Sequence, residues 1–155
     1  MTASEEPLRA FLSHSAKART AVAPILDRAE ALLHARGWRT RVPRRAAQGS
    51  VDVEERRRLR EQSYAEIKRS DLVFHLPAPA ALSGARLNRE LQRAVRLGQP
   101  IWLLICDDLR TEHGIGAPDP ERLDLLLKET RGTALRTLSD LSLLLGDWPT
   151  RSVQR

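Results

Sequence analysis

Apolar residues follow two different patterns along this chain. Short, nearly continuous apolar runs predict buried strands, and longer segments with apolar residues every three or four positions predict amphipathic helices. Strands are predicted at residues 8–12, 38–42, 72–76, 101–106 and 133–138. Helices are predicted from about 20 to 36, from 52 to 69, between the third and fourth strands, from 119 to 127 and from 139 to 145. Strand and helix therefore alternate throughout.

This alternation predicts one α/β domain over residues 1–155, with its core at about 8–148. We expect three layers, with a flavodoxin-like, mainly parallel five-stranded sheet in the order 2-1-3-4-5 and helices on both faces. Such sheets bind ligands beyond the carboxyl ends of their strands, where the strand order reverses. That position lies between the first and third strands, so residues 13–15 and 77–84 are expected to meet there.

Glu90 is the candidate functional residue of the helix between the third and fourth strands. On a helical wheel, Leu87, Leu91 and Ala94 form its apolar stripe, and Glu90 lies at the border of that stripe, two turns into the helix. The pattern alone leaves open whether Glu90 is an ordinary half-exposed glutamate. The preceding helix places Ser63 on its inward face.

Composition limits the class of protein. The chain has 41% hydrophobic residues and a single cysteine, Cys106, at the end of an apolar strand, which indicates a buried thiol in a reducing, cytoplasmic compartment. The acidic start at 1–7 does not resemble a signal peptide, and no apolar run reaches the ~18 residues of a membrane span. No Cys or His spacing indicates a metal site, so we expect no metal.

The net charge of +6 and a pI near 10.6 suggest an acidic partner. However, the densest basic run, 56–60, is flanked by glutamates, as in a solvated helix face, and lacks aromatic residues for base stacking. Nucleic acid is therefore not the expected partner.

Two motifs resemble those of Toll/interleukin-1 receptor (TIR) domains. The segment 11–17, Phe-Leu-Ser-His-Ser-Ala-Lys, is similar to the strand-and-turn box that opens these domains. The stretch from Ser70 to Leu91 resembles their strand, turn, serine and helix with Glu-Leu. The resemblance implies cleavage of the nicotinamide–ribose bond of NAD, with Glu90 as the catalytic glutamate. It also implies that the domain forms homo-oligomers.

The chain is also similar to nucleoside 2-deoxyribosyltransferases and nucleotide N-glycosidases. This similarity rests on residues 61–71, Pro79, Ser83-Gly84 and Glu90. Where that family has an aspartate on the second helix, this chain has Ser63. A third possibility is a non-catalytic TIR-type interaction module, since fold does not determine function.

Leaving-group chemistry favours NAD among these substrates. Cleavage of an N-glycosidic bond makes an oxocarbenium-like ribose that one carboxylate can stabilise, whereas a neutral base leaves well only when an acid protonates it. Nicotinamide leaves from a cationic pyridinium and needs no proton. With a serine at position 63, a site with one glutamate suits NAD, although His14 or His75 could supply a proton.

These resemblances assign roles to further residues, with NAD or a nucleotide as substrate and no cofactor. Backbone N–H groups near the start of the first helix are expected to bind phosphate or ribose. Ser83 is expected to bind a ribose hydroxyl or, more simply, to cap the helix. We interpret His75 as a hydrogen-bonded core histidine and Asp71 as a residue that begins a strand. The predicted site residues are Glu90 as the catalytic group and Ser13, His14, Ser15, Ser63 and Ser83 as substrate-binding groups, with Arg44 and Arg45 as candidate phosphate contacts.

Overall fold

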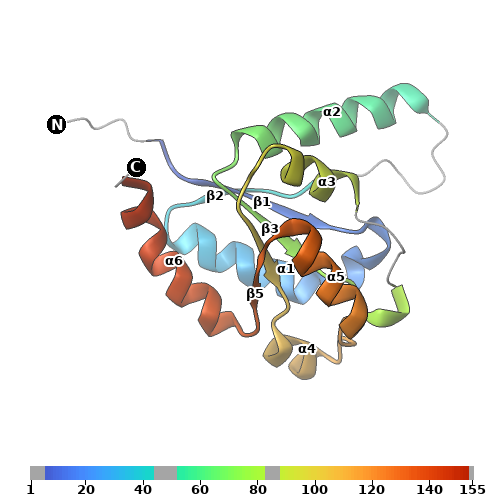
Figure 1. Ribbon diagram of the computed structural model, residues 1–155, viewed down its shortest axis with the longest axis vertical. Helices are drawn as coiled ribbons and strands as arrows, with labels where there is room; N and C mark the ends of the chain where they lie inside the picture. Colours follow the sequence, from blue (N-terminus) through green and yellow to red (C-terminus); the bar gives the residue numbers. More distant parts are fainter. Residues whose placement is uncertain (1–5, 44–51, 83–87, 154–155) are drawn as a thin grey trace.

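The centre of the molecule is a parallel five-stranded sheet, here seen in a computed structural model that describes residues 6–43, 52–82 and 88–153 (Figure 1). The strand order is β2-β1-β3-β4-β5, and all four neighbouring pairs are parallel. The strands are β1 (Arg9–His14), β2 (Arg39–Arg41), β3 (Leu72–Leu76), β4 (Ile101–Leu104) and β5 (Thr133–Leu135). The predicted fold class and strand order are confirmed.

Helices cover both faces of this sheet. They are α1 (Arg19–Ala35), α2 (Val53–Arg69), α3 (Arg89–Arg96), α4 (Asp107–His113), α5 (Pro120–Thr130) and α6 (Leu138–Val153), with short 3-10 turns at Ala16–Ala18 and Ala80–Leu82. The α1 and α6 helices pack on one face, and α2, α3 and α5 pack on the other. Within the described ranges, no helix has the length and apolar character needed to cross a membrane.

Alternation along the strands divides the core into two halves. In β1, Leu12 belongs to the cluster under α1, whereas Phe11 belongs to the cluster under α2 and α3. All five residues of β3 are buried, as expected for a central strand covered on both sides. By the same alternation, Ser13 faces α2 and α3, and His14 faces the opposite layer.

Side-chain caps begin two of the predicted helices. The Asp52 carboxylate accepts a hydrogen bond from the Glu55 N–H at 3.1 Å, and the Asp119 carboxylate accepts one from the Arg122 N–H at 3.0 Å. Each bond satisfies a backbone donor in the first turn that has no partner within the helix. Both predicted starts are therefore confirmed.

Several element boundaries differ from the prediction. The first strand continues to His14, while the second, fourth and fifth strands are shorter than expected. The segment after Asp107 forms α4 rather than a loop, and the last helix runs to Val153 rather than stopping at Leu145. Sequence periodicity thus located the elements better than it located their ends.

Candidate active site

The carboxyl ends of β1 and β3 lie side by side at the predicted reversal of strand order. Ser13 and His75 are register partners on these strands, so their side chains lie on the same face of the sheet. Both are buried, and the Ser13 hydroxyl lies 3.2 Å from His75 Nδ1. The interpretation of His75 as a buried, hydrogen-bonded histidine is therefore confirmed.

Asn88 connects this pair to α3. Its Oδ1 accepts a hydrogen bond from the Leu91 N–H at 2.8 Å, which caps the helix. This bond orients the amide so that Nδ2 donates to the Ser13 hydroxyl at 3.2 Å. Asn88 is thus the N-cap of α3, which begins later than predicted. Ser83, which was expected to bind a ribose hydroxyl or cap this helix, lies outside the described residues. Asn88 was missed, although an asparagine before Arg-Glu-Leu is a helix-start signal.

Glu90 is the second residue of α3, and only 7% of its surface is exposed. It lies in the first turn and not two turns into the helix as expected, because the helix begins at Arg89. The unpaired N–H groups of a first turn make that end of a helix favourable for a negative charge. A carboxylate held there can face a cationic centre without leaving the protein interior.

His14 is the last residue of β1, and Ser15 follows it directly. His14 is fully buried, and its Nδ1 lies 3.0 Å from the Ser15 carbonyl oxygen, which can only accept a hydrogen bond, so Nδ1 carries the proton. The Ser15 hydroxyl oxygen is buried and makes no hydrogen bond to any residue that the structure describes.

His75 stays uncharged at neutral pH. Burial, followed by the neighbouring His14 and Arg122, lowers the pKa of His75 from 6.5 to about 3. A neutral imidazole can accept a hydrogen bond or donate one, but it does not act as a general acid at pH 7. This property bears directly on which leaving group the site could release.

Other predicted residues lie elsewhere or outside the described ranges. Ser63 faces inward as predicted. However, it lines a separate cavity of about 200 Å³ between α2 and residues 40–42, at the end of β2. Asp71 accepts a hydrogen bond from the Arg9 N–H at 2.9 Å, immediately before β3, which confirms it as a residue that begins a strand. Arg44 and Arg45 are outside the described residues.

Arg110 stabilises the same edge of the sheet, a role that no sequence pattern indicated. The side chain is 3% exposed, and it donates hydrogen bonds to the carbonyl oxygens of Ile105 at 2.6 Å, Gly116 at 2.8 Å and Pro77 at 2.6 Å. These carbonyls belong to the segments that follow β4, α4 and β3. One guanidinium thus holds together the chain segments around the carboxyl edge.

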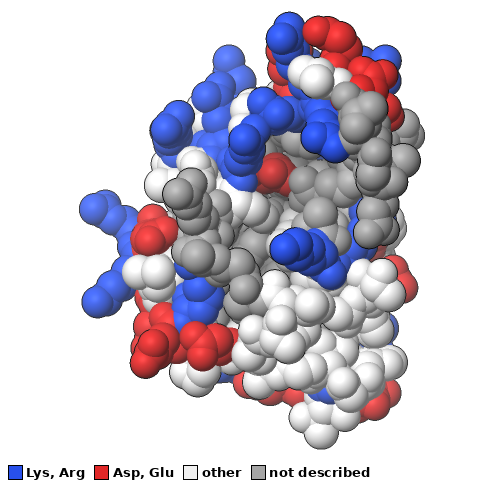
Figure 2. All heavy atoms as spheres, turned by 90° about the vertical axis from the view of Figure 1, so that its right-hand side faces the viewer, with Lys and Arg blue, Asp and Glu red and all other residues white. Residues whose placement is uncertain are grey.

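Figure 2 shows this carboxyl edge from outside, with acidic atoms recessed among Lys and Arg side chains. Positive side chains around a recessed carboxylate suit a ligand that carries phosphate groups and a reacting sugar. Among the described residues, no group of three or more His, Cys, Asp or Glu side chains is arranged to hold a metal ion.

Comparisons with known proteins found several solved structures that are similar to this chain. No family profile and no curated protein sequence matches the chain. Its structure is similar to the CMP N-glycosidase BcmB of Clostridium botulinum, with TM-score 0.49 and 16% identity over 89% of this chain and 96% of that one. It is also similar to a 2-deoxyribosyltransferase of Bacillus psychrosaccharolyticus, with TM-score 0.45 and 21% identity over 62% of this chain and 71% of that one.

A homoserine dehydrogenase from S. aureus matches more weakly, with TM-score 0.40 and 11% identity over 85% of this chain and 32% of that one. None of these three structures is a TIR domain, so the resemblance to that family stays a prediction from motifs. A function must be assigned from the residues of this chain.

Proposed function

We propose that this protein cleaves the N-glycosidic bond of a nucleotide, with Glu90 as the carboxylate that faces the anomeric carbon. The observation that carries the proposal is the burial of Glu90 in the first turn of α3, where Asn88 ties the helix to Ser13. This position is the point of strand reversal at which parallel sheets bind ligands.

Glu90 would stabilise positive charge on the sugar. As the bond from C1′ to the base nitrogen breaks, its electron pair leaves with the base and C1′ becomes oxocarbenium-like. A carboxylate in a site of low dielectric stabilises that cation or traps it covalently. Water then adds to C1′ and releases a proton.

The neutral state of His75 favours NAD as the substrate. A purine or pyrimidine needs a proton to leave, and His75, with a pKa of about 3, does not supply one at pH 7. Nicotinamide accepts the bond's electron pair into its pyridinium ring and leaves neutral. Hydrolysis of NAD⁺ by water would therefore yield ADP-ribose, nicotinamide and one proton.

We assign the remaining predicted residues according to their hydrogen bonds. Ser13 is already bonded to His75 and Asn88, so it positions α3. The Ser15 hydroxyl, together with the backbone at the start of α1, is the proposed contact for phosphate or ribose. Within this short segment, the proposal thus makes Ser13 a positioning residue and Ser15 a binding residue.

The test is base release by the purified protein. It is incubated separately with NAD and with nucleoside monophosphates, and the products are separated by chromatography. We expect nicotinamide release, and a loss of at least ~100-fold in Glu90→Gln, since removing one group that stabilises transition-state charge has effects of this order.

Glu121→Gln is the matched control. Glu121 occupies the same position of α5 as Glu90 does of α3, but it is exposed, so its substitution should leave the rate unchanged. Base release only from a monophosphate, abolished in Glu90→Gln, would keep the glycosidase class and reject NAD. No release from any substrate, with concentration-dependent self-association, would favour an interaction module.

A further inference from the structure

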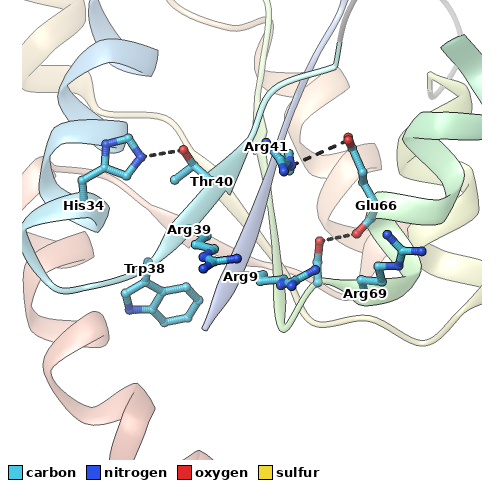
Figure 3. A pocket seen from close by; sticks show the side chains of 9 residues that line it. Arg9, His34, Trp38, Arg39, Thr40, Arg41, Glu66 and Arg69 are labelled. Carbon is cyan, nitrogen blue, oxygen red and sulfur yellow. Dashed lines mark hydrogen bonds and ion pairs between the residues drawn. The ribbon is translucent and has the colours of Figure 1, made fainter. Parts of the chain in front are cut away.

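A pocket lies at the opposite, amino-terminal edge of the sheet. Its cavity of about 310 Å³ is formed by the start of β1, by β2 and by the last turns of α1 and α2. Since β1 has six residues, this pocket is about 17 Å along the strand from His14. It is therefore distinct from the site around Glu90. The residues that line it are Arg9, His34, Trp38, Arg39, Thr40, Arg41, Glu66, Arg69 and Ser70 (Figure 3).

Four arginines give this pocket a strong positive charge. Only one carboxylate, Glu66, is among its lining residues, so four guanidiniums and one carboxylate leave a formal charge of +3. Glu66 lies 3.7 Å from Arg41. Within the described chain, Arg9, Arg39 and Arg69 form no salt bridge with an acidic side chain. Acidic side chains in the part of the chain that the structure describes thus neutralise only part of this positive charge.

Arg9 and Arg39 lie side by side and repel each other unless an anion binds between them. Arg9 and Arg39 are direct register partners on neighbouring strands, and like charges in that position repel each other. In Figure 3 the Arg9 side chain lies between those of Arg39 and Arg69. Guanidinium groups that line one pocket can bind the oxygen atoms of phosphate with paired hydrogen bonds.

We propose that this pocket binds a compact, multiply charged phosphate anion of the pyrophosphate class. The size of the cavity is at the lower end of the range for small-molecule sites. Trp38 is only 3% exposed, so its ring offers no platform for stacking a base. The adjoining cavity, of about 500 Å³, includes Glu6 and Asp71, which disfavour a long polyanion that continues through it.

The test is calorimetric titration of the full chain with pyrophosphate alone. Arg9→Gln combined with Arg39→Gln should weaken binding at least ~10-fold, because two charge-assisted contacts are removed. The control pair is Arg58→Gln with Arg60→Gln, which lowers the net charge equally at exposed positions of α2. The affinity of this control pair for pyrophosphate should stay within about twofold of the wild type. Absence of pyrophosphate binding, or equal weakening by both pairs, would overturn the proposal.

Two further measurements sharpen the result. Without ligand, the pocket pair should melt about 1–3 °C above the wild type, because the cross-strand repulsion is gone, whereas the control pair should not. Fluorescence anisotropy with a single-stranded 20-nucleotide DNA tests the competing ligand. DNA binding that is stronger than pyrophosphate binding, and is lost in the pocket pair, would replace the compact anion by nucleic acid. Release of base at the Glu90 edge should be the same in both pairs.

Discussion

Asn88→Ala should disturb both the fold and the proposed chemistry, because one amide makes two structural hydrogen bonds. The substitution removes the cap of α3, worth about 1 kcal/mol. It also removes the 3.2 Å bond to the Ser13 hydroxyl, worth about another 1 kcal/mol. The free energy of unfolding should fall by about 2 kcal/mol, and the melting temperature by about 4–8 °C.

Asn88→Asp separates the two bonds. An aspartate keeps the acceptor for the Leu91 N–H and suits the start of a helix, so capping should survive. It has no Nδ2 donor for Ser13, and the expected loss is about 1 kcal/mol. Urea unfolding measures both variants, and base release measures the effect on Glu90, which lies two residues further along.

Asp119→Ala is the control for a cap without a link to Ser13. It removes the bond to the Arg122 N–H and should cost about 1 kcal/mol, with base release within about twofold of the wild type. The reasoning is refuted if Asn88→Ala unfolds within about 0.3 kcal/mol of the wild type. Equal destabilisation by the alanine and aspartate variants would refute the assignment of two separate bonds.

Two further predictions concern His75 and Arg110. The pKa of folded His75, about 3, is below the unfolded value of 6.5, so its stabilising contribution is complete above pH 6.5 and is lost as pH falls toward 3. Between pH 7 and pH 5 the wild type should therefore lose about 2 kcal/mol more stability than His75→Gln in urea unfolding, and equal losses would contradict the lowered pKa. Arg110→Met should lower the free energy of unfolding by about 3 kcal/mol or more, because it leaves three carbonyl oxygens without a hydrogen-bond donor. Arg110→Lys should lower it by less. Equal unfolding midpoints for the two Arg110 variants would show that these bonds contribute little.

Periodicity was sufficient to predict the alternation of strands and helices. The strand order and the edge where candidate residues meet followed from the flavodoxin-like class that this alternation suggested. The reason is physical: strands buried on both faces, such as β3, need continuous apolar runs, and crossover helices need one apolar stripe. Helix starts were less predictable. Leu87 was included in the stripe of α3, which moved the expected start away from Asn88, the residue that connects the helix to Ser13.

Two other features gave weak sequence signals. The α4 helix was predicted to be a loop. It begins after Cys106, which has a left-handed conformation with φ of 50° and makes no side-chain cap, so the start of α4 lacks the usual sequence signal. Burial raises the pKa of the Cys106 thiol to about 12, as expected for an inert core cysteine. Arg110 was not singled out from the sequence, since its partners are backbone carbonyls that no residue pattern reveals.

The short outer strands of the sheet limit how copies of this protein can associate. β2 and β5, at the two margins, have only three residues each. Edge strands this short offer few unpaired backbone groups to a strand from another molecule, which protects against fibre-like stacking. If the expected homo-oligomer forms, its contacts should therefore come from helices and loops, and the five strands should remain within one molecule.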